Sequence, residues 1–203
     1  RDRSHRSRLL VTGRAPVETL SGVFTGKMPK APEPWDGDGW RGMAQYSAVL
    51  TAKGRMVADL RVMWGLEPEV ESLLLDVPSA ATELLLAHLG HFVPPRLATV
   101  ANVSEEAGLL AVLGPEGAPA ISEVVMDGRV SADALVGLGE GEFLMSGTGP
   151  DQIRIVKICD VDVPAWDLFS SGERAKELWR RLTDQGARPV GVGVWDTLRV
   201  EAG

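Results

Sequence analysis

Residues 45–64, QYSAVLTAKGRMVADLRVMW, predict a β-hairpin with one strand at 45–50, a turn at 51–55 and a second strand at 56–64. Successive side chains of a strand point to opposite faces of a sheet. One face of the second strand is therefore wholly apolar and consists of Met56, Ala58, Leu60, Val62 and Trp64. Asp59 lies on the other face, as a carboxylate in the middle of an apolar strand.

Two interpretations of Asp59 are open on this pattern. Antiparallel sheets commonly turn one face to water, and in the first interpretation Asp59 is a solvated residue on that face. In the second, the same face lines a cleft and Asp59 binds a ligand. The pattern alone favours the solvated position, because aspartates are mostly exposed in folded proteins.

The composition excludes several classes of protein. The chain has 203 residues and a formal net charge of −7, and an acidic chain repels the phosphate backbone, so we expect no nucleic-acid partner. No run approaches the length of about 18 apolar residues that spans a bilayer, so we expect no membrane partner. Basic residues cluster in RDRSHRSR at residues 1–8, which we interpret as a flexible terminus or a truncated leader.

The single cysteine, Cys159, cannot form an internal disulfide. It ends the apolar run IRIVKIC, so we expect a buried side chain and a reducing, cytoplasmic setting. His88 and His91 lie three residues apart near a predicted helix end, but no third ligand has suitable spacing. The sequence therefore predicts no metal site.

Hydrophobic spacing and Gly and Pro positions predict alternating strands and helices. Besides the hairpin, strands are expected at 9–12, 72–77, 96–103, 108–113 and 153–161, with strands and tight turns in 128–149. Helices are expected at 15–24, 80–89, about 115–125 and 171–185, and a long loop at 26–42. This order predicts an α+β fold with helices packed on largely antiparallel sheets.

The common catalytic motifs are not found in the sequence. Gly191 and Gly193 lack the third glycine and the strand–turn–helix context of a dinucleotide fingerprint. There is also no Walker loop, no Gly-x-Ser-x-Gly elbow and no Cys-x-x-Cys pair. The residues alone therefore leave open whether the chain is an enzyme.

Several motifs occur in an order and spacing that resemble one family. The first is Tyr46-Ser47-x3-Thr51-x2-Gly54-Arg55-x3-Asp59-Leu60, and the others are LAVLGP at 110–115, LWRRL at 178–182 and DTLRVEAG at 196–203. Together they resemble the folate-binding family of the glycine-cleavage aminomethyltransferases and the YgfZ-type proteins. The likeness covers nearly the whole chain.

This resemblance implies one folate-binding GcvT-like domain over residues 1–203, with approximate halves 1–105 and 106–203. The two halves would be similar antiparallel-sheet and helix subdomains that exchange strands, with a tetrahydrofolate or related folate in a central cavity. Members of the family continue past the EAG motif, so the resemblance implies that the C-terminal part of the family is absent here.

The resemblance also implies which residues bind the folate cofactor. Tyr46 and Asp59 match a tyrosine and an aspartate that contact the folate, and Met63 stands where the family has a second tyrosine. Arg199 and Glu201 keep the arginine and glutamate of the closing motif, and pairing with each other is an alternative role for them. If the chain is a transferase, Asp59 is the expected catalytic residue.

Departures from the family pattern favour one of its two branches. Ala58 replaces an aspartate, Trp195 replaces an arginine, and a Gly-Tyr-Thr-Gly-Glu segment is missing. Lys53-Gly54-Arg55 is closer to the YgfZ-type branch. We therefore expect a tetrahydrofolate-binding YgfZ-like protein that assists iron–sulfur cluster assembly or repair, with iron–sulfur enzymes or assembly proteins as partners. The alternative is a folate-dependent aminomethyltransferase or related one-carbon enzyme.

Overall fold

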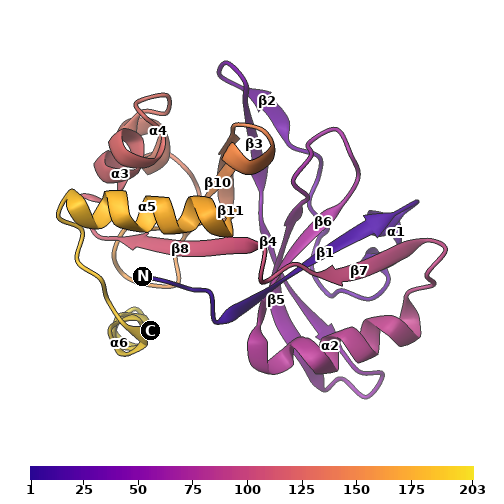
Figure 1. The fold of residues 1–203 in the computed structure, drawn as a ribbon. Coiled ribbons are helices and arrows are strands. Elements are labelled where there is room, and N and C mark those ends of the chain that lie inside the picture. Colours follow the sequence, from indigo (N-terminus) through magenta and orange to yellow (C-terminus); the bar gives the residue numbers. More distant parts are fainter. The chain divides into compact units, whose positions relative to one another are not determined.

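The computed structural model describes the backbone of residues 1–203 and the side chains other than that of Pro150. The fold is α+β, as predicted, and the chain divides into two compact units (Figure 1). The N-terminal unit is His5–Glu105. The C-terminal unit combines Arg1–Ser4 with Glu106–Gly203, so the first four residues belong to the unit formed by the second half of the chain.

The N-terminal unit is built on an antiparallel sheet with the strand order β4-β5-β6-β1-β7. Its strands are β1 (Arg6–Gly13), β4 (Gln45–Leu50), β5 (Met56–Trp64), β6 (Leu73–Pro78) and β7 (Ala98–Asn102). Its helices are α1 (Pro16–Ser21) and α2 (Ser79–Phe92), and α2 packs against β5, β6 and β1 on one face of the sheet (Figure 1). The β4–β5 hairpin has the predicted bounds.

The core of this unit lies between the sheet and α2. Ala58, Leu60 and Val62 of β5 point into it, as predicted. The predicted apolar face is wrong at its start, because the β4–β5 register shifts between Val49 and Leu50. This bulge leaves Met56 63% exposed and buries Val57.

A second hairpin lies where a loop was expected at 26–42. It consists of β2 (Glu33–Trp35) and β3 (Gly39–Met43). A Cβ on Gly39 would lie 3.0 Å from the Trp35 ring, so the glycine lets the tryptophan pack on the opposite strand. The many Pro, Gly and Asp residues of this segment are typical of a loop, so the two short strands were not predicted. Trp35 and Trp40 are both partly buried, as expected.

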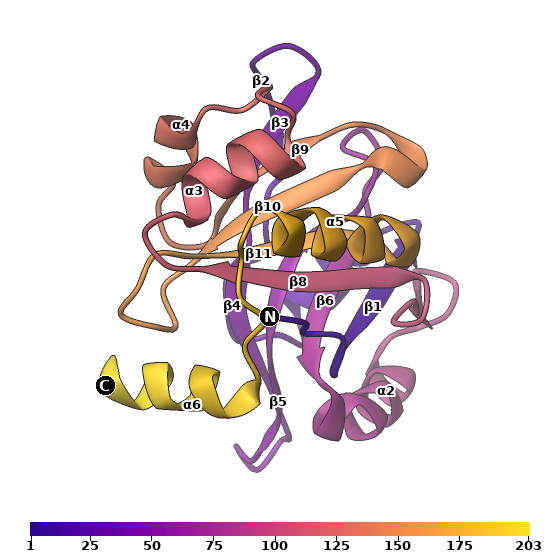
Figure 2. The same cartoon turned by 60° about the vertical axis from the view of Figure 1, so that its left-hand side comes forward.

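The C-terminal unit contains strands in the hydrogen-bonded order β9-β10-β11-β8, all antiparallel. They are β8 (Ala107–Leu113), β9 (Glu142–Ser146), β10 (Ile153–Ile158) and β11 (Ala165–Ser171). The helical elements are α3 (Gly117–Ala120), a π-helical turn η1 (Ile121–Val125), α4 (Ala132–Val136), a 3₁₀ turn η2 (Gly149–Asp151), α5 (Gly172–Asp184) and α6 (Val192–Glu201). Helix α5 packs on β8 and β11, and Figure 2 shows it running along β8.

Other elements differ in detail from the expectations. Strand β11 and helix α4 were not predicted, and the helix expected at 115–125 is divided between α3 and η1. Helix α2 continues through Gly90 to Phe92, where Pro94 then prevents further extension. Helix α1 ends early, and Phe24 instead forms a β-bridge with Val49. Cys159 is exposed rather than buried, because β10 ends one residue before it.

The basic start of the chain is not a flexible terminus. Arg3 is buried in the C-terminal unit, and Arg6 and Arg8 belong to β1 of the N-terminal unit. Arg6 and Arg8 are two residues apart on β1, so their side chains point to the same face of the sheet. Among the described helices, none is long and apolar enough to cross a membrane.

Candidate ligand-binding site

Tyr46 and Asp59 lie together on the face of the N-terminal sheet that α2 does not cover. Tyr46 is opposite Arg61 and Asp59 is opposite Ala48, so the two residues are diagonal neighbours across the hairpin. The Tyr46 hydroxyl donates a hydrogen bond of 2.9 Å to Oδ2 of Asp59. Tyr46 is 68% exposed and Asp59 is partly exposed, so this pair is open to a ligand.

A row of polar residues continues from Tyr46 across the sheet. In the antiparallel register Tyr46 is opposite Arg61, Arg61 is opposite Asp76, and Asp76 is opposite Arg8. Residues that are directly opposite share one face. The row runs from the exposed Tyr46 to Asp76 and Arg8, which are buried. One face of this sheet is therefore apolar core and the other carries charges.

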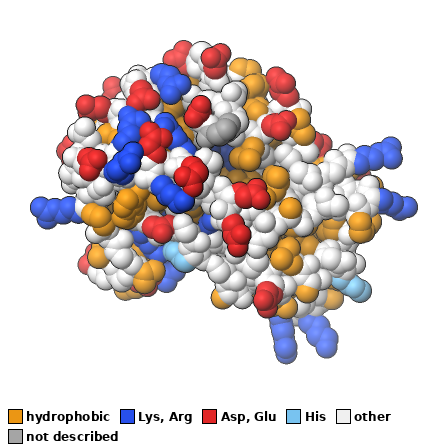
Figure 3. Space-filling model, viewed as in Figure 1, with side chains coloured by type: hydrophobic (Ala, Val, Ile, Leu, Met, Phe, Trp, Pro, Cys, Tyr) orange, Lys and Arg blue, Asp and Glu red, His pale blue; other side chains and the backbone are white. Residues whose placement is uncertain are grey.

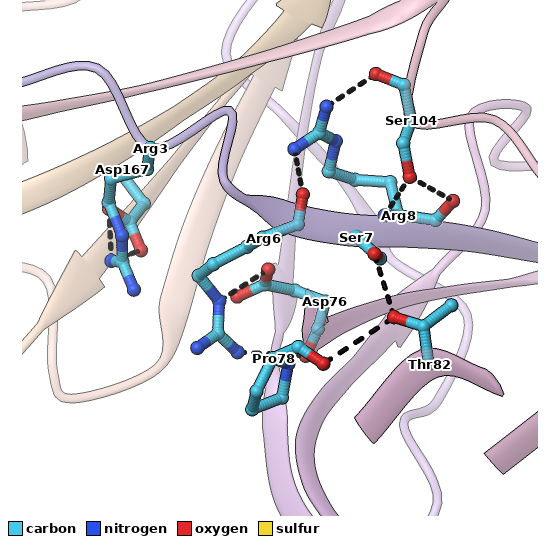
Figure 4. Close-up of polar contacts among 9 residues, drawn as sticks. All are labelled: Arg3, Arg6, Ser7, Arg8, Asp76, Pro78, Thr82, Ser104 and Asp167. Carbon is cyan, nitrogen blue, oxygen red and sulfur yellow. Dashed lines mark hydrogen bonds and ion pairs between the residues drawn. The ribbon is translucent and has the colours of Figure 1, made fainter. Parts of the chain in front are cut away.

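Asp76 is a fully buried carboxylate in this row. Arg6 Nε donates to its Oδ1 at 2.7 Å, and Arg6 Nη2 donates to its main-chain oxygen at 3.1 Å (Figure 4). Among the described residues, Oδ2 of Asp76 has no hydrogen-bond partner. A buried acceptor without a donor costs free energy, so Asp76 retains the capacity to accept a hydrogen bond.

The C-terminal unit contains a second buried carboxylate, Asp167 of β11. Arg3 Nη1 donates to Oδ1 at 2.7 Å and also contacts Oδ2 (Figure 4). The guanidinium carbons of Arg3 and Arg1 lie 4.8 and 4.9 Å from the ring centre of Trp195, which is the buried residue of α6. These cation–π contacts hold the start of the chain against the last helix.

Arg154 of β10 lies on the same face of the C-terminal sheet as Asp167, since Val156 is opposite Asp167. Its guanidinium carbon is 4.7 Å from the ring centre of Phe143, and its Nη2 lies 3.4 Å from the Met145 sulfur. Burial lowers the pKa of Arg154 to about 9 because desolvation disfavours the charged form. Arg154 is still cationic at neutral pH.

The structure brings together only part of the predicted site. Met63 shares a strand with Asp59 but is fully buried. Arg199 and Glu201 lie on α6, in the other unit, and both are exposed. Residues two apart on a helix point in different directions, which argues against their pairing with each other. The folate contacts of these three residues stay predictions.

The sequence reasoning missed Arg6, Asp76, Arg3 and Asp167. A signal was present for Asp76, which interrupts the apolar run LLLDV as Asp59 interrupts β5. Arg6 and Arg8 also alternate as strand residues do. No such signal exists for the pairing of Arg3 with Asp167, which are 164 positions apart.

The loss of an aspartate at position 58 has a structural explanation. Ala58 is buried in the core, on the face of β5 opposite to Asp59. Its methyl group therefore contributes to packing, and the replacement removes no charge from the face that carries Tyr46 and Asp59. Among the described residues, no group of three or more His, Cys, Asp or Glu could hold a metal ion.

Comparison with known proteins gives consistent matches. The family model described as GCVT N-terminal domain matches residues 1–203. An aminomethyltransferase of Synechocystis is 28% identical, and the match covers 100% of this chain and 51% of that protein. An aminomethyltransferase of Rubrobacter xylanophilus is 32% identical over 80% of this chain and 41% of its own length. The chain thus spans about half the length of these curated relatives.

Two solved structures share the fold. The glycine cleavage system aminomethyltransferase T from Bartonella henselae superposes with a TM-score of 0.71 at 19% identity, covering 98% of this chain and 49% of that one. A heterotetrameric sarcosine oxidase from Corynebacterium sp. U-96 gives a TM-score of 0.50 at 14% identity, covering 94% of this chain and 86% of that one. Proteins of different name thus share this fold, and fold alone does not fix a reaction.

Proposed function

Because the chain belongs to the GCVT N-terminal domain family, we propose that it binds a tetrahydrofolate-type ligand as part of an aminomethyltransferase-like protein. The observation that carries the proposal is the hydrogen bond from Tyr46 to Asp59 on the charged face of the N-terminal sheet. This pair combines an exposed aromatic ring with an oriented carboxylate. The names of the relatives supply the reaction class.

Asp59 is the proposed primary ligand contact. A pterin carries N–H donors, and an ionised carboxylate can accept about four hydrogen bonds on its two oxygens. The hydrogen bond from Tyr46 uses one of these positions and fixes the carboxylate in one orientation. Charge-assisted hydrogen bonds of this kind are stronger than neutral ones.

In a transferase, Asp59 would orient or activate the amine of the folate that accepts the one-carbon unit. Positioning of a reactant supplies a large share of many enzymatic rate enhancements. Asp76 is a second candidate acceptor in the same face, through Oδ2. Because Asp76 is fully buried, a ligand reaches it only when neighbouring side chains move, and Asp59 is therefore the first contact.

The proposal takes the transferase alternative rather than the YgfZ-like expectation. That expectation relied on Lys53-Gly54-Arg55, which lies in the turn of the β4–β5 hairpin, where Gly54 has a φ of 74°. Turn geometry accounts for this glycine whichever branch is considered. The relatives described above are aminomethyltransferases, and they give no support to a role in iron–sulfur cluster assembly. The cytoplasmic location stays a prediction.

A titration of tetrahydrofolate against tryptophan fluorescence tests the binding. We expect a saturable change, and Asp59→Ala should weaken binding by about 1.5–3 kcal/mol, as for other hydrogen bonds to charged groups. Glu83→Ala is the matched control, because Glu83 is exposed on α2, over the opposite face of the sheet. Absence of binding at millimolar ligand would refute the proposal, and an unchanged affinity of Asp59→Ala would refute the role of Asp59.

The reaction needs a separate test. Aminomethyl transfer should be measured in a glycine-cleavage assay with the partner proteins, using the protein in the form that the cell produces. Folate binding together with transfer activity that Asp59→Ala removes is the expected result. Folate binding without transfer would limit the proposal to ligand binding.

A further inference from the structure

The C-terminal unit contains a cavity of about 250 Å³ that the proposed folate site does not use. Its lining residues come from the end of η1 and the segment after it, the β9–β10 connection and α5, and they include Arg129, Gly147, Asp151 and Arg174. Sites for drug-sized ligands are usually about 300–1,000 Å³. This cavity therefore fits a small molecule rather than a folate.

Arg174 lines this cavity and has one buried donor without a partner among the described residues. Its side chain is only 15% exposed, and its Nη1 donates to Glu177 Oε2 at 2.7 Å. Its Nε is buried and has no hydrogen-bond partner among the described residues. A buried N–H group without an acceptor is costly and uncommon in folded proteins. The guanidinium group of Arg174 therefore has hydrogen-bonding capacity left for an acceptor, which reaches the buried Nε only when neighbouring side chains move.

Arg129 is the second cation that lines the cavity. Its Nε donates to the main-chain oxygen of Met126 at 3.3 Å, and its Nη2 lies 3.7 Å from Asp127 Oδ2. Asp127 is bound more closely by Arg181, whose Nη2 donates to Oδ1 at 2.6 Å. Arg129 thus makes only a longer contact with Asp127, and its Nη groups can also donate to a ligand.

The backbone around the cavity has an unusual conformation on both sides. Asp127 has a φ of 48°, which only a few non-glycine residues adopt, and it follows the π-helical turn η1. On the other side, a Cβ on Gly147 would lie 2.7 Å from the main-chain oxygen of Asp151, so only glycine lets this connection close.

The charge balance limits what can bind. Figure 3 shows basic and acidic side chains interspersed where α5 lies, rather than one basic patch. Asp151 also lines the cavity and is exposed. A highly charged ligand would be repelled by this carboxylate, whereas one small oxyanion can bind the two guanidinium groups.

We propose that this cavity is an oxyanion site in which Arg174 and Arg129 bind a small molecule that carries a phosphate or carboxylate group. The guanidinium group presents N–H donors in a planar fork that matches both of these anions. Asp151 also lines the cavity, and its negative charge lowers the affinity for an anion. The site is independent of the folate proposal, because it uses none of the same residues.

Calorimetric titrations with inorganic phosphate and, separately, with acetate test this site and distinguish the two anions. We expect saturable binding of at least one of them. Arg174→Gln should weaken it at least tenfold, as for a lost hydrogen bond to a charged group. Arg129→Gln should weaken it severalfold. Arg180→Gln is the matched control, since Arg180 is exposed on the same helix and does not line the cavity.

Asp151→Asn distinguishes a simple anion from a zwitterionic ligand, because it removes the negative charge that lines the cavity beside the two arginines. It should tighten anion binding severalfold, whereas a zwitterionic occupant that used Asp151 would bind more weakly. Arg129→Gln and Asp151→Asn change exposed side chains, so they carry the test if Arg174→Gln does not fold. Absence of saturable binding by both anions, an equal loss in Arg180→Gln, or weaker binding in Asp151→Asn would overturn the proposal.

Discussion

The two units each bury one carboxylate against one arginine from the start of the chain, but they do so differently. In the C-terminal unit, Arg3 Nη1 reaches both oxygens of Asp167. In the N-terminal unit, Arg6 reaches only Oδ1 of Asp76, and its other hydrogen bond goes to the main chain. Oδ2 of Asp76 thus retains acceptor capacity on the face that also carries Asp59.

This difference separates a structural pair from a candidate binding group. Burying two charges is costly, and a buried ion pair is stable only when good geometry and further hydrogen bonds compensate for the lost hydration. Arg3 contacts both oxygens of Asp167 and lies on the ring of Trp195, while its own Nε has no hydrogen-bond partner among the described residues. In the Arg6–Asp76 pair it is the carboxylate that keeps an oxygen without a partner among those residues, and this oxygen could accept a hydrogen bond from a ligand.

Arg3→Ala should have the largest effect. It leaves the fully buried Asp167 without its arginine, and breaking a buried pair in this way typically costs about 3–5 kcal/mol. The free energy of unfolding in urea measures the loss. The double variant Arg3→Leu/Asp167→Leu should recover much of it, because neither charge of this pair is then left buried without the other. A loss below about 1 kcal/mol would mean that the pair is not structural.

Arg6→Ala should destabilise the protein less, by about 2 kcal/mol, because the Arg6 side chain is already 17% exposed, so that water can partly replace its two hydrogen bonds to Asp76. Urea unfolding of this variant, compared with that of Arg14→Ala at an exposed position, isolates the effect of the pair. A loss as large as that in Arg3→Ala would remove the difference between the two units.

Tyr46→Phe tests the exposed end of the polar row. The hydroxyl orients Asp59, so we expect tetrahydrofolate binding to weaken by about 1 kcal/mol, the usual contribution of one hydrogen bond. Stability should hardly change, because Tyr46 is largely exposed. A fluorescence titration and a thermal unfolding curve measure the two quantities. A change in unfolding temperature without a change in affinity would assign the tyrosine to the fold.

Asp127→Asn should have the smallest effect. The hydrogen bond from Arg181 lowers the pKa of Asp127, so its stabilising contribution is present above the ordinary pKa of an aspartate and is lost as the pH falls through the lowered value. The side chain is half exposed, so the loss should be well below about 1 kcal/mol. Unfolding curves of variant and parent should therefore differ at pH 7 and converge as the pH falls through the lowered pKa of Asp127. A difference that persists after Asp127 is protonated would indicate backbone strain instead.

Local patterns predicted the elements whose structure is decided locally. The β4–β5 hairpin and α5 followed from alternation and from an apolar stripe, with Ser171 capping the helix. The β2–β3 hairpin could not be predicted from such patterns, because its short strands depend on the packing of Trp35 over Gly39. Tyr46 and Asp59 could be assigned to one face from the hairpin register alone.

The buried pairs could not be predicted, because they depend on pairings far apart in the sequence. Arg6 and Asp76 are 70 positions apart, and Arg3 and Asp167 are 164 apart. A cluster of arginines at the start of a chain is most often a solvated tail, and only the tertiary structure shows that these side chains are buried. The same limit applies to Arg174 and Arg129, which meet only around a cavity.

The placement of the first eight residues has a consequence for biosynthesis. Arg3 is made 164 positions before its partner Asp167 on β11, so Arg1–Ser4 cannot dock on the C-terminal unit until β11 has been synthesised. Contacts between such distant positions also slow folding in general. The N-terminal unit can therefore close around Arg6 before Arg1–Ser4 docks on the C-terminal unit.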